Sequence, residues 1–111
     1  MLVKEVDAAE LQARLDAGDD IALIDIRSDA ELAQGILPNA EHLAMHLIPL
    51  RMHDLPKDKD VVLYCRSGAR SYHACAYLMQ QGYTNVANVV GGIDAWSKEI
   101  DSTVPTYSGY K

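Results

Sequence analysis

Three short apolar segments, each followed by a helical pattern, constrain the fold more than any other feature of this chain. They lie at residues 21–25, 60–64 and 85–90. Continuous apolar runs of this length are typical of strands buried on both faces of a parallel sheet, with helices as the connections. We therefore predict an α/β fold with a central parallel sheet flanked by helices on both faces. Ligands of such a sheet bind beyond the carboxyl ends of its strands.

Capping-box patterns and glycines mark where two helices begin and end. Asp7 and Ser28 each precede a glutamate by three residues, a pattern typical of a helix start, and Gly18 and Gly35 follow as stop signals. The other predicted elements are strands at 3–6 and 41–45, a short helix within 46–53 that Pro49 limits to a turn or two, a helix from 71 that ends at Gly82, and a helical segment at 93–98.

Length and charge exclude several classes of protein. With 111 residues, 49% of them hydrophobic, the chain is predicted to form one domain over residues 1–111, with 101–111 as a loosely docked tail. The net charge of −6 argues against a nucleic-acid partner, and no apolar run is long enough to cross a membrane. The first residues lack the pattern of a secretory signal, so we expect a cytoplasmic protein.

One loop carries the strongest chemical signal. It follows the strand at 60–64 and reads Cys65-Arg66-Ser67-Gly68-Ala69-Arg70. A cysteine between a strand end and a helix start meets backbone N–H groups and the positive end of the helix, which favour a thiolate and an anionic ligand. Gly68 allows a tight turn, and the two arginines add positive charge. We interpret this segment, the Cys65 loop (residues 65–70), as an anion-binding loop around a nucleophile, with the amides of residues 66–70 directed at the sulfur.

Three segments, in order, give the chain a resemblance to a known family. They are Leu23-Ile24-Asp25-Ile26-Arg27 with Glu31 and Gly35, then residues 64–71 around the Cys65 loop, then Gly91-Gly92-Ile93-Asp94-Ala95-Trp96. Together they resemble a single-domain rhodanese from about residue 3 to about residue 98. The resemblance implies the rhodanese fold and sulfurtransferase activity through a persulfide on Cys65. The sequence departs from the family pattern Gly-His-Ile-Pro-Gly-Ala, which reads here Gly35-Ile36-Leu37-Pro38-Asn39-Ala40.

The expected chemistry requires no metal and no organic cofactor. The Cys65 thiolate would attack the outer sulfur of a small anionic donor such as thiosulfate, and a thiol or cyanide would then take the sulfur from the persulfide. The alternative is a persulfide relay that passes sulfur to a sulfur-carrier protein, with residues 47–55 and the tail deciding which acceptor fits. A cysteine phosphatase or arsenate reductase is disfavoured, because four residues separate Cys65 from Arg70 whereas such phosphatases have five.

Supporting roles are assigned to side chains around the loop. Arg66, with no evident partner, is expected to meet the anionic substrate, and Arg70 is expected to form a buried pair with Asp25. Arg27 and Glu31 are expected to link the second strand to its helix. Ser67 and Ser71 are expected to cap the helix, and the alternative is that their hydroxyls support the thiolate.

The second cysteine and the histidines are not assigned a chemical role. Cys75 lies on the apolar face of a predicted helix, so we expect packing, and a disulfide with Cys65 is not expected to be within reach. His42, His46 and His53 have loosely helical spacing but no completing ligand, so we predict solvated side chains and no metal site. A helix-surface position is expected for His73.

Overall fold

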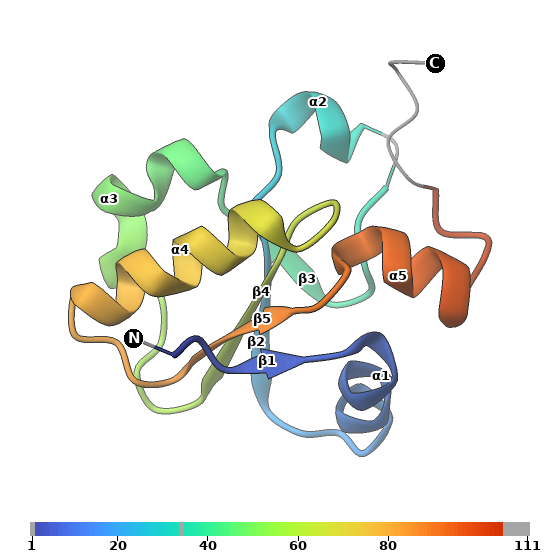
Figure 1. The fold of residues 1–111 in the computed structure, drawn as a ribbon, viewed down its shortest axis with the longest axis horizontal. Coiled ribbons are helices and arrows are strands. Elements are labelled where there is room, and N and C mark those ends of the chain that lie inside the picture. Colours follow the sequence, from blue (N-terminus) through green and yellow to red (C-terminus); the bar gives the residue numbers. More distant parts are fainter. Residues whose placement is uncertain (1, 34, 106–111) are drawn as a thin grey trace.

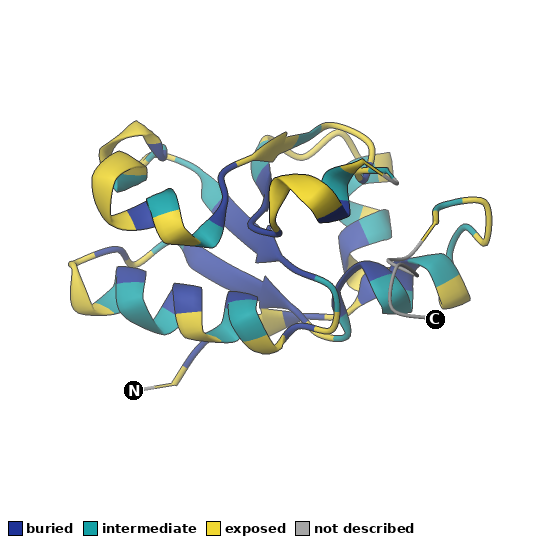
Figure 2. Ribbon diagram, turned by 90° about the horizontal axis from the view of Figure 1, so that it is seen from above, coloured by how far each residue is buried: buried dark blue, intermediate teal, exposed yellow. Residues whose placement is uncertain are grey.

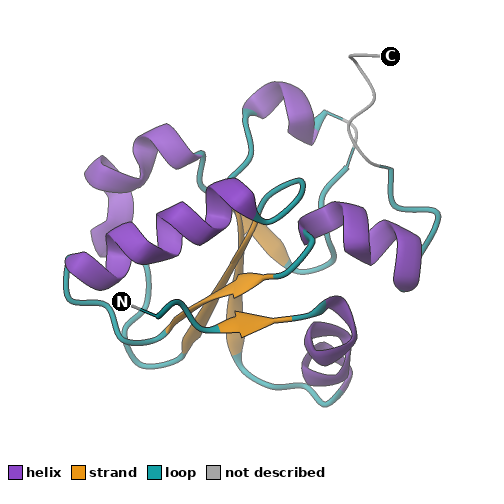
Figure 3. Cartoon of the chain, viewed as in Figure 1, coloured by secondary structure: helices purple, strands orange, loops and turns teal. Residues whose placement is uncertain are grey.

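The computed structural model describes residues 2–33 and 35–105 and has the predicted α/β fold. A five-stranded parallel sheet in the order β1-β5-β4-β2-β3 forms its centre (Figures 1 and 3). Its strands are β1 (Glu5–Val6), β2 (Ile21–Asp25), β3 (Ala40–His42), β4 (Asp60–Tyr64) and β5 (Val86–Val89). The two edge strands are shorter than the predicted 3–6 and 41–45.

Helices cover both faces of the sheet. One face packs against α4 (Ala69–Gln80) and α3 (Ile48–Arg51), and the other packs against α1 (Ala8–Asp16) and α5 (Gly92–Glu99). The short helix α2 (Asp29–Leu32) follows β2, and the 3-10 turns Met45–Leu47 and Met52–Asp54 flank α3. Pro49 lies in the first turn of α3, where the helix requires no hydrogen bond from its backbone nitrogen.

The strands of the centre are buried because their side chains alternate between two apolar cores. Val61 and Leu63 of β4 point into the core under α4, while Val62 and Tyr64 point into the core under α1 and α5. Figure 2 shows these strands as the buried layer between partly exposed helices. Within the described residues, no helix is both long and apolar enough to span a membrane.

Both predicted capping boxes are confirmed. Asp7 accepts a hydrogen bond from the Glu10 amide, and Ser28 accepts one from the Glu31 amide, with each glutamate bonding back to its cap. The departure from the family pattern also has an explanation. Asn39 has a φ of 65°, so it occupies a left-handed conformation that glycine adopts freely and asparagine tolerates.

Strand register brings the functional segments to one edge of the sheet. Asp25 of β2 lies opposite Tyr64 of β4, so the residues after these strands are neighbours. The Ile26 amide continues the pairing by donating to the Tyr64 carbonyl at 3.0 Å. The Cys65 loop therefore starts at the carboxyl edge, between the segments that follow β2 and β5.

Candidate active site

The Cys65 loop connects β4 to α4 through a left-handed glycine. Gly68 is the residue before the first turn of α4 and has a φ of 98°. A Cβ at this position would lie 3.1 Å from the Gly91 nitrogen and the Val89 oxygen, so the loop packs directly on the turn after β5. The predicted need for glycine at this turn is confirmed.

The sulfur of Cys65 is surrounded by hydrogen-bond donors. The Gly68 amide donates to Sγ at 3.2 Å, and the Ser71 hydroxyl lies 3.4 Å from Sγ. Burial opposes ionisation of Cys65, but hydrogen bonds from the Ser71 hydroxyl and from the amides of residues 71, 68 and 67 outweigh it, so the pKa of the thiol is lowered. These amides overlap the predicted set, 66–70, without matching it.

Cys65 itself is completely buried. Its side chain belongs to the apolar core cluster that also contains Ile26 and Ala74. A solute can contact this sulfur only after a neighbouring side chain or the loop has moved. Burial also keeps water away from the sulfur, which strengthens the hydrogen bonds that hold a negative charge there.

The carbonyl oxygens of the loop are held by the start of α5. The amide of Ile93 donates to the Cys65 oxygen at 2.9 Å, and the amide of Asp94 donates to the Arg66 oxygen at 3.1 Å. A Cβ on Gly92 would lie 2.3 Å from the Cys65 oxygen, so only glycine fits there. The sequence indicated a turn at Gly92 but gave no sign that the loop rests on it.

Arg66 has a partner that we did not predict. Its Nε lies 3.5 Å from the Asp94 carboxylate, and both side chains are partly exposed. The expectation that nothing nearby pairs Arg66 is therefore wrong. A solvent-exposed pair of this length is weak.

The predicted Arg70–Asp25 pair is wrong, because Arg70 pairs with Glu31. Two parallel hydrogen bonds of 2.7 and 2.8 Å join the guanidinium to the Glu31 carboxylate. Bonding to Arg70 outweighs the effect of burial and lowers the pKa of Glu31 from 4.5 to about 2. The pair ties the start of α4 to α2, and Arg70 keeps its charge near the sulfur.

Asp25 pairs with Arg27 instead, and both side chains are completely buried. Arg27 donates to the Asp25 carboxylate from Nε at 3.0 Å and from Nη2 at 2.8 Å, and to the Gly35 oxygen at 2.6 Å. The predicted Arg27–Glu31 link is therefore replaced by a local pair that fixes the segment after β2. Asp25 has a structural position beside the loop, and its carboxylate is occupied by Arg27.

Ser71 does not cap α4. It is the third residue of the helix, it is buried, and its hydroxyl lies between Cys65 Sγ and the side chain of Asn88. Support of the sulfur, the other reading of Ser71, is what the geometry shows. Ser67 is exposed, and no side-chain bond caps α4. Asn88 was missed, because an asparagine inside an apolar strand pattern gave no reason to connect it with the loop.

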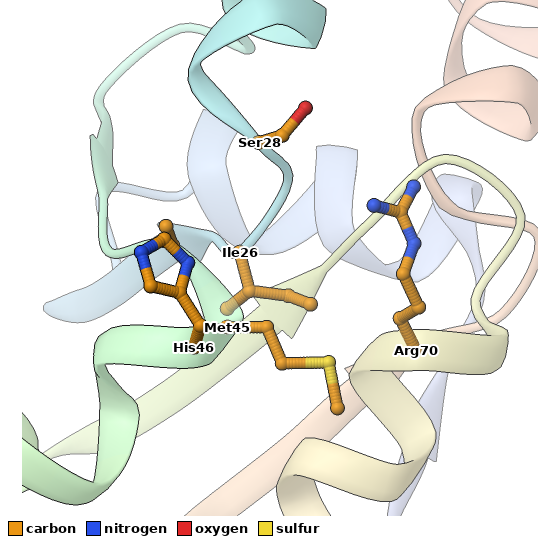
Figure 4. Close-up of a pocket in the computed structure, with 6 residues that line it drawn as sticks. Ile26, Ser28, Met45, His46 and Arg70 are labelled. Atoms are coloured by element: carbon orange, nitrogen blue, oxygen red, sulfur yellow. The ribbon is translucent and has the colours of Figure 1, made fainter.

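A pocket of about 310 Å³ opens beside the loop. Figure 4 shows the Arg70 side chain extending toward Ser28, with Ile26 and Met45 between Arg70 and His46. Ala44 completes the lining. The pocket is thus lined by apolar side chains and by Arg70, and its lining ends at His46, one residue before the segment 47–55 that was expected to influence acceptor choice.

Cys75 lies where it was expected. Cys75 is buried and unpaired in the apolar core, where burial raises its pKa to about 12. His46, His53 and His73 are exposed, as expected, whereas the prediction of a solvated His42 is wrong, because its Nε2 lies 2.6 Å from the Arg27 oxygen. The structure, as far as it describes the chain, has no group of three metal-ligating side chains.

Comparisons with known proteins agree with this geometry. The family described as "Rhodanese-like domain" matches residues 7–99. A protein of Allochromatium vinosum named "Sulfurtransferase" is 60% identical over 87% of this chain and 91% of its own length. A Bacillus subtilis protein named "Putative sulfurtransferase YtwF" is 46% identical over 89% of this chain and 95% of its own. The solved structure of a rhodanese-like domain protein from Staphylococcus aureus superposes with a TM-score of 0.82, at 30% identity over 96% of this chain and all of that one.

Proposed function

Because this chain belongs to the rhodanese-like domain family and its relatives carry the name sulfurtransferase, we propose that it is a sulfurtransferase that carries sulfane sulfur as a persulfide on Cys65. The observation that carries the proposal is the set of donors directed at Cys65 Sγ, led by the Gly68 amide and the Ser71 hydroxyl. Donors of this kind stabilise a negative charge on sulfur without a metal. Both cysteines are unpaired, which fits the expected reducing, cytoplasmic setting.

In the first step, once a neighbouring side chain or the loop has moved and exposed the sulfur, the Cys65 thiolate attacks the outer sulfur of thiosulfate. A bond forms between Cys65 Sγ and that sulfur, the bond to the sulfonyl sulfur breaks, and sulfite leaves with its electron pair. The negative charge then resides on the terminal sulfur of the persulfide. Arg66 and Arg70 stand next to Cys65 in the loop and at the start of α4, and their positive charges would offset the charge of the dianionic donor.

In the second step an acceptor thiolate or cyanide attacks the terminal sulfur. The new bond forms to the acceptor, and the sulfur–sulfur bond of the persulfide returns its electron pair to Cys65 as thiolate. The enzyme ends as it began, so no oxidant or reductant is consumed. The pocket beside the loop has an apolar floor of Ile26, Ala44 and Met45, which suits the carbon body of a thiol better than cyanide.

A persulfide relay differs only in the acceptor. The same pocket is open to the surface, so a flexible chain end of a sulfur-carrier protein is the alternative acceptor to a small thiol. A phosphatase or arsenate reductase remains disfavoured on the loop spacing, because four residues separate Cys65 from Arg70 whereas such phosphatases have five.

Thiosulfate and cyanide test the proposal directly. We expect wild-type protein to release thiocyanate and sulfite in equal amounts, and we expect the Cys65→Ser variant to release neither. The matched control is Cys75→Ser, which removes the other buried thiol and should retain turnover. Turnover by Cys65→Ser would refute the proposal. So would a wild-type protein that shows no turnover even when small thiols and persulfidated carrier proteins are also offered.

A further inference from the structure

Asn88 is a buried polar side chain beside the active site to which the chemistry above gives no role. It lies in β5 and is 1% exposed. Its Nδ2 donates to the Gly68 carbonyl at 3.1 Å and to the Glu5 carboxylate at 3.0 Å, while its Oδ1 accepts from the Ser71 hydroxyl. Asn88 thus joins β1 and β5 to the Cys65 loop.

These partners fix which way the amide points. A backbone carbonyl and a carboxylate only accept hydrogen bonds, so the Gly68 and Glu5 oxygens must face Nδ2. The amide oxygen then faces Ser71, and that oxygen can only accept. Its bond to Ser71 forms only when the hydroxyl proton points at Asn88.

The Ser71 hydroxyl also lies 3.4 Å from Cys65 Sγ. A hydroxyl has one proton and two lone pairs, so it can donate to Asn88 or to the sulfur, but not to both. When Ser71 donates to Asn88, it offers the sulfur a lone pair, which suits a neutral thiol. When Ser71 donates to the sulfur, it stabilises a thiolate and leaves Asn88 Oδ1 without that bond.

We propose that Asn88 is a positioning residue that holds the Ser71 proton away from Cys65 until the sulfur carries a negative charge. Two oxygens in contact as close as Ser71 Oγ and Asn88 Oδ1 need a proton between them, and Asn88 Oδ1 carries none, so the resting hydroxyl donates to Asn88. Formation of the thiolate rotates the proton toward Sγ, where it remains as long as the sulfur is anionic. The inference rests on the proposed role of Cys65 as nucleophile.

A double-mutant cycle separates this role from simple packing. The measurement is the pH midpoint for alkylation of Cys65 by iodoacetamide, followed at that residue by peptide mass. Asn88→Val frees the Ser71 proton for the thiolate and should lower the midpoint by about half a pH unit or more. Ser71→Ala removes the donor and should raise it. The double variant should match Ser71→Ala, because Asn88 acts only through Ser71.

Charged groups near the sulfur stay the same throughout the cycle. They come from the loop and from each element around it: Arg66, Arg70, Glu31 on α2, Asp25 at the end of β2, Arg27 after β2, Asp94 on α5, and Glu5 on β1. A change in midpoint therefore reports the hydroxyl proton and not a change in local charge.

Asn85→Val is the matched control. Asn85 also donates from Nδ2 to two carbonyl oxygens, those of Pro56 and Lys59, but these contacts lie away from Ser71. This variant should lose stability and keep the wild-type midpoint. The inference is overturned if Asn88→Val leaves the midpoint unchanged or raises it, or if its effect persists in the Ser71→Ala background.

A measurement on unmutated Asn88 applies even if Asn88→Val does not fold. The NMR shift of the Asn88 side-chain carbonyl carbon should titrate with Cys65 in wild-type protein and should not in Ser71→Ala. The inference is overturned if this shift does not change with the ionisation of Cys65 in wild-type protein, or if it changes in both proteins. None of these experiments uses a sulfur donor, so the inference can fail while sulfur transfer stands, and the reverse.

Discussion

At the scale of single residues, Gly92 shows how closely two segments meet at the active site. Its φ of 56° and the 2.3 Å approach of a hypothetical Cβ to the Cys65 oxygen leave no space for a side chain. Gly92→Ala should therefore lower the free energy of unfolding by about 2 to 4 kcal/mol, from overpacking and backbone strain. Chemical denaturation measures the loss.

Gly18→Ala is the control for backbone strain alone. Gly18 also has a positive φ, 75°, but a Cβ there meets nothing within 4 Å. This variant should lose only about 1 kcal/mol. Equal losses for both alanine variants would contradict the claim that Gly92 is required by the loop carbonyls.

What the sequence revealed at this scale depended on distance along the chain. Gly68 and Cys65 were predictable, because a strand, a turn and a helix follow one another within a few residues. Asn88 and Gly92 were not, since their contacts with the loop exist only after β5 has paired beside β4. Arg66 was assigned no partner for the same reason, because Asp94 arrives with α5.

At the scale of elements, the Glu31–Arg70 pair connects α2 to α4. The folded-state pKa of Glu31, about 2, lies below its ordinary 4.5, so the pair stabilises the fold fully above about pH 4.5 and is lost as the pH falls toward 2. Glu31→Gln should lower stability at neutral pH by about 1 to 2 kcal/mol, a value discounted because Arg70 is 40% exposed. Denaturation at several pH values measures it.

A second glutamate variant serves as the control for these denaturation experiments. Glu99→Gln changes an exposed glutamate at the end of α5 and should change stability at neutral pH by less than about 0.5 kcal/mol. Glu31→Gln should lose less stability than wild-type protein between pH 4.5 and 2. If wild-type protein and Glu31→Gln have the same slope in that range, the pair does not stabilise the fold.

Elements were predicted better than the ion pairs between them. Both capping boxes and the main strands follow local patterns, so the sequence located them within a few residues. The choice between Asp25 and Glu31 as the partner of Arg70 depends on which carboxylate the Arg27 side chain pairs with. Arg27 folds back onto Asp25 two residues away, which leaves Glu31 for Arg70.

At the scale of the whole molecule, the parallel sheet and its two helical layers follow from the strand–helix alternation. The lateral order β1-β5-β4-β2-β3 could not be derived in that way, because every central strand has a similar apolar pattern. The assignment of residues 1–111 to one domain stays a prediction. Of the predicted tail, Val104 docks through its carbonyl to the Ser97 hydroxyl at 2.6 Å, and residues 106–111 lie outside the described part.

The central claim is that Cys65 carries sulfur, and intact-mass spectrometry after exposure to thiosulfate tests it most directly. We predict that wild-type protein and Cys75→Ser each gain one sulfur atom, that the gain maps to the peptide containing Cys65, and that dithiothreitol removes it. Cys65→Ser should gain none. A sulfur atom found on Cys75 in wild-type protein, or retained by Cys65→Ser, would contradict the account.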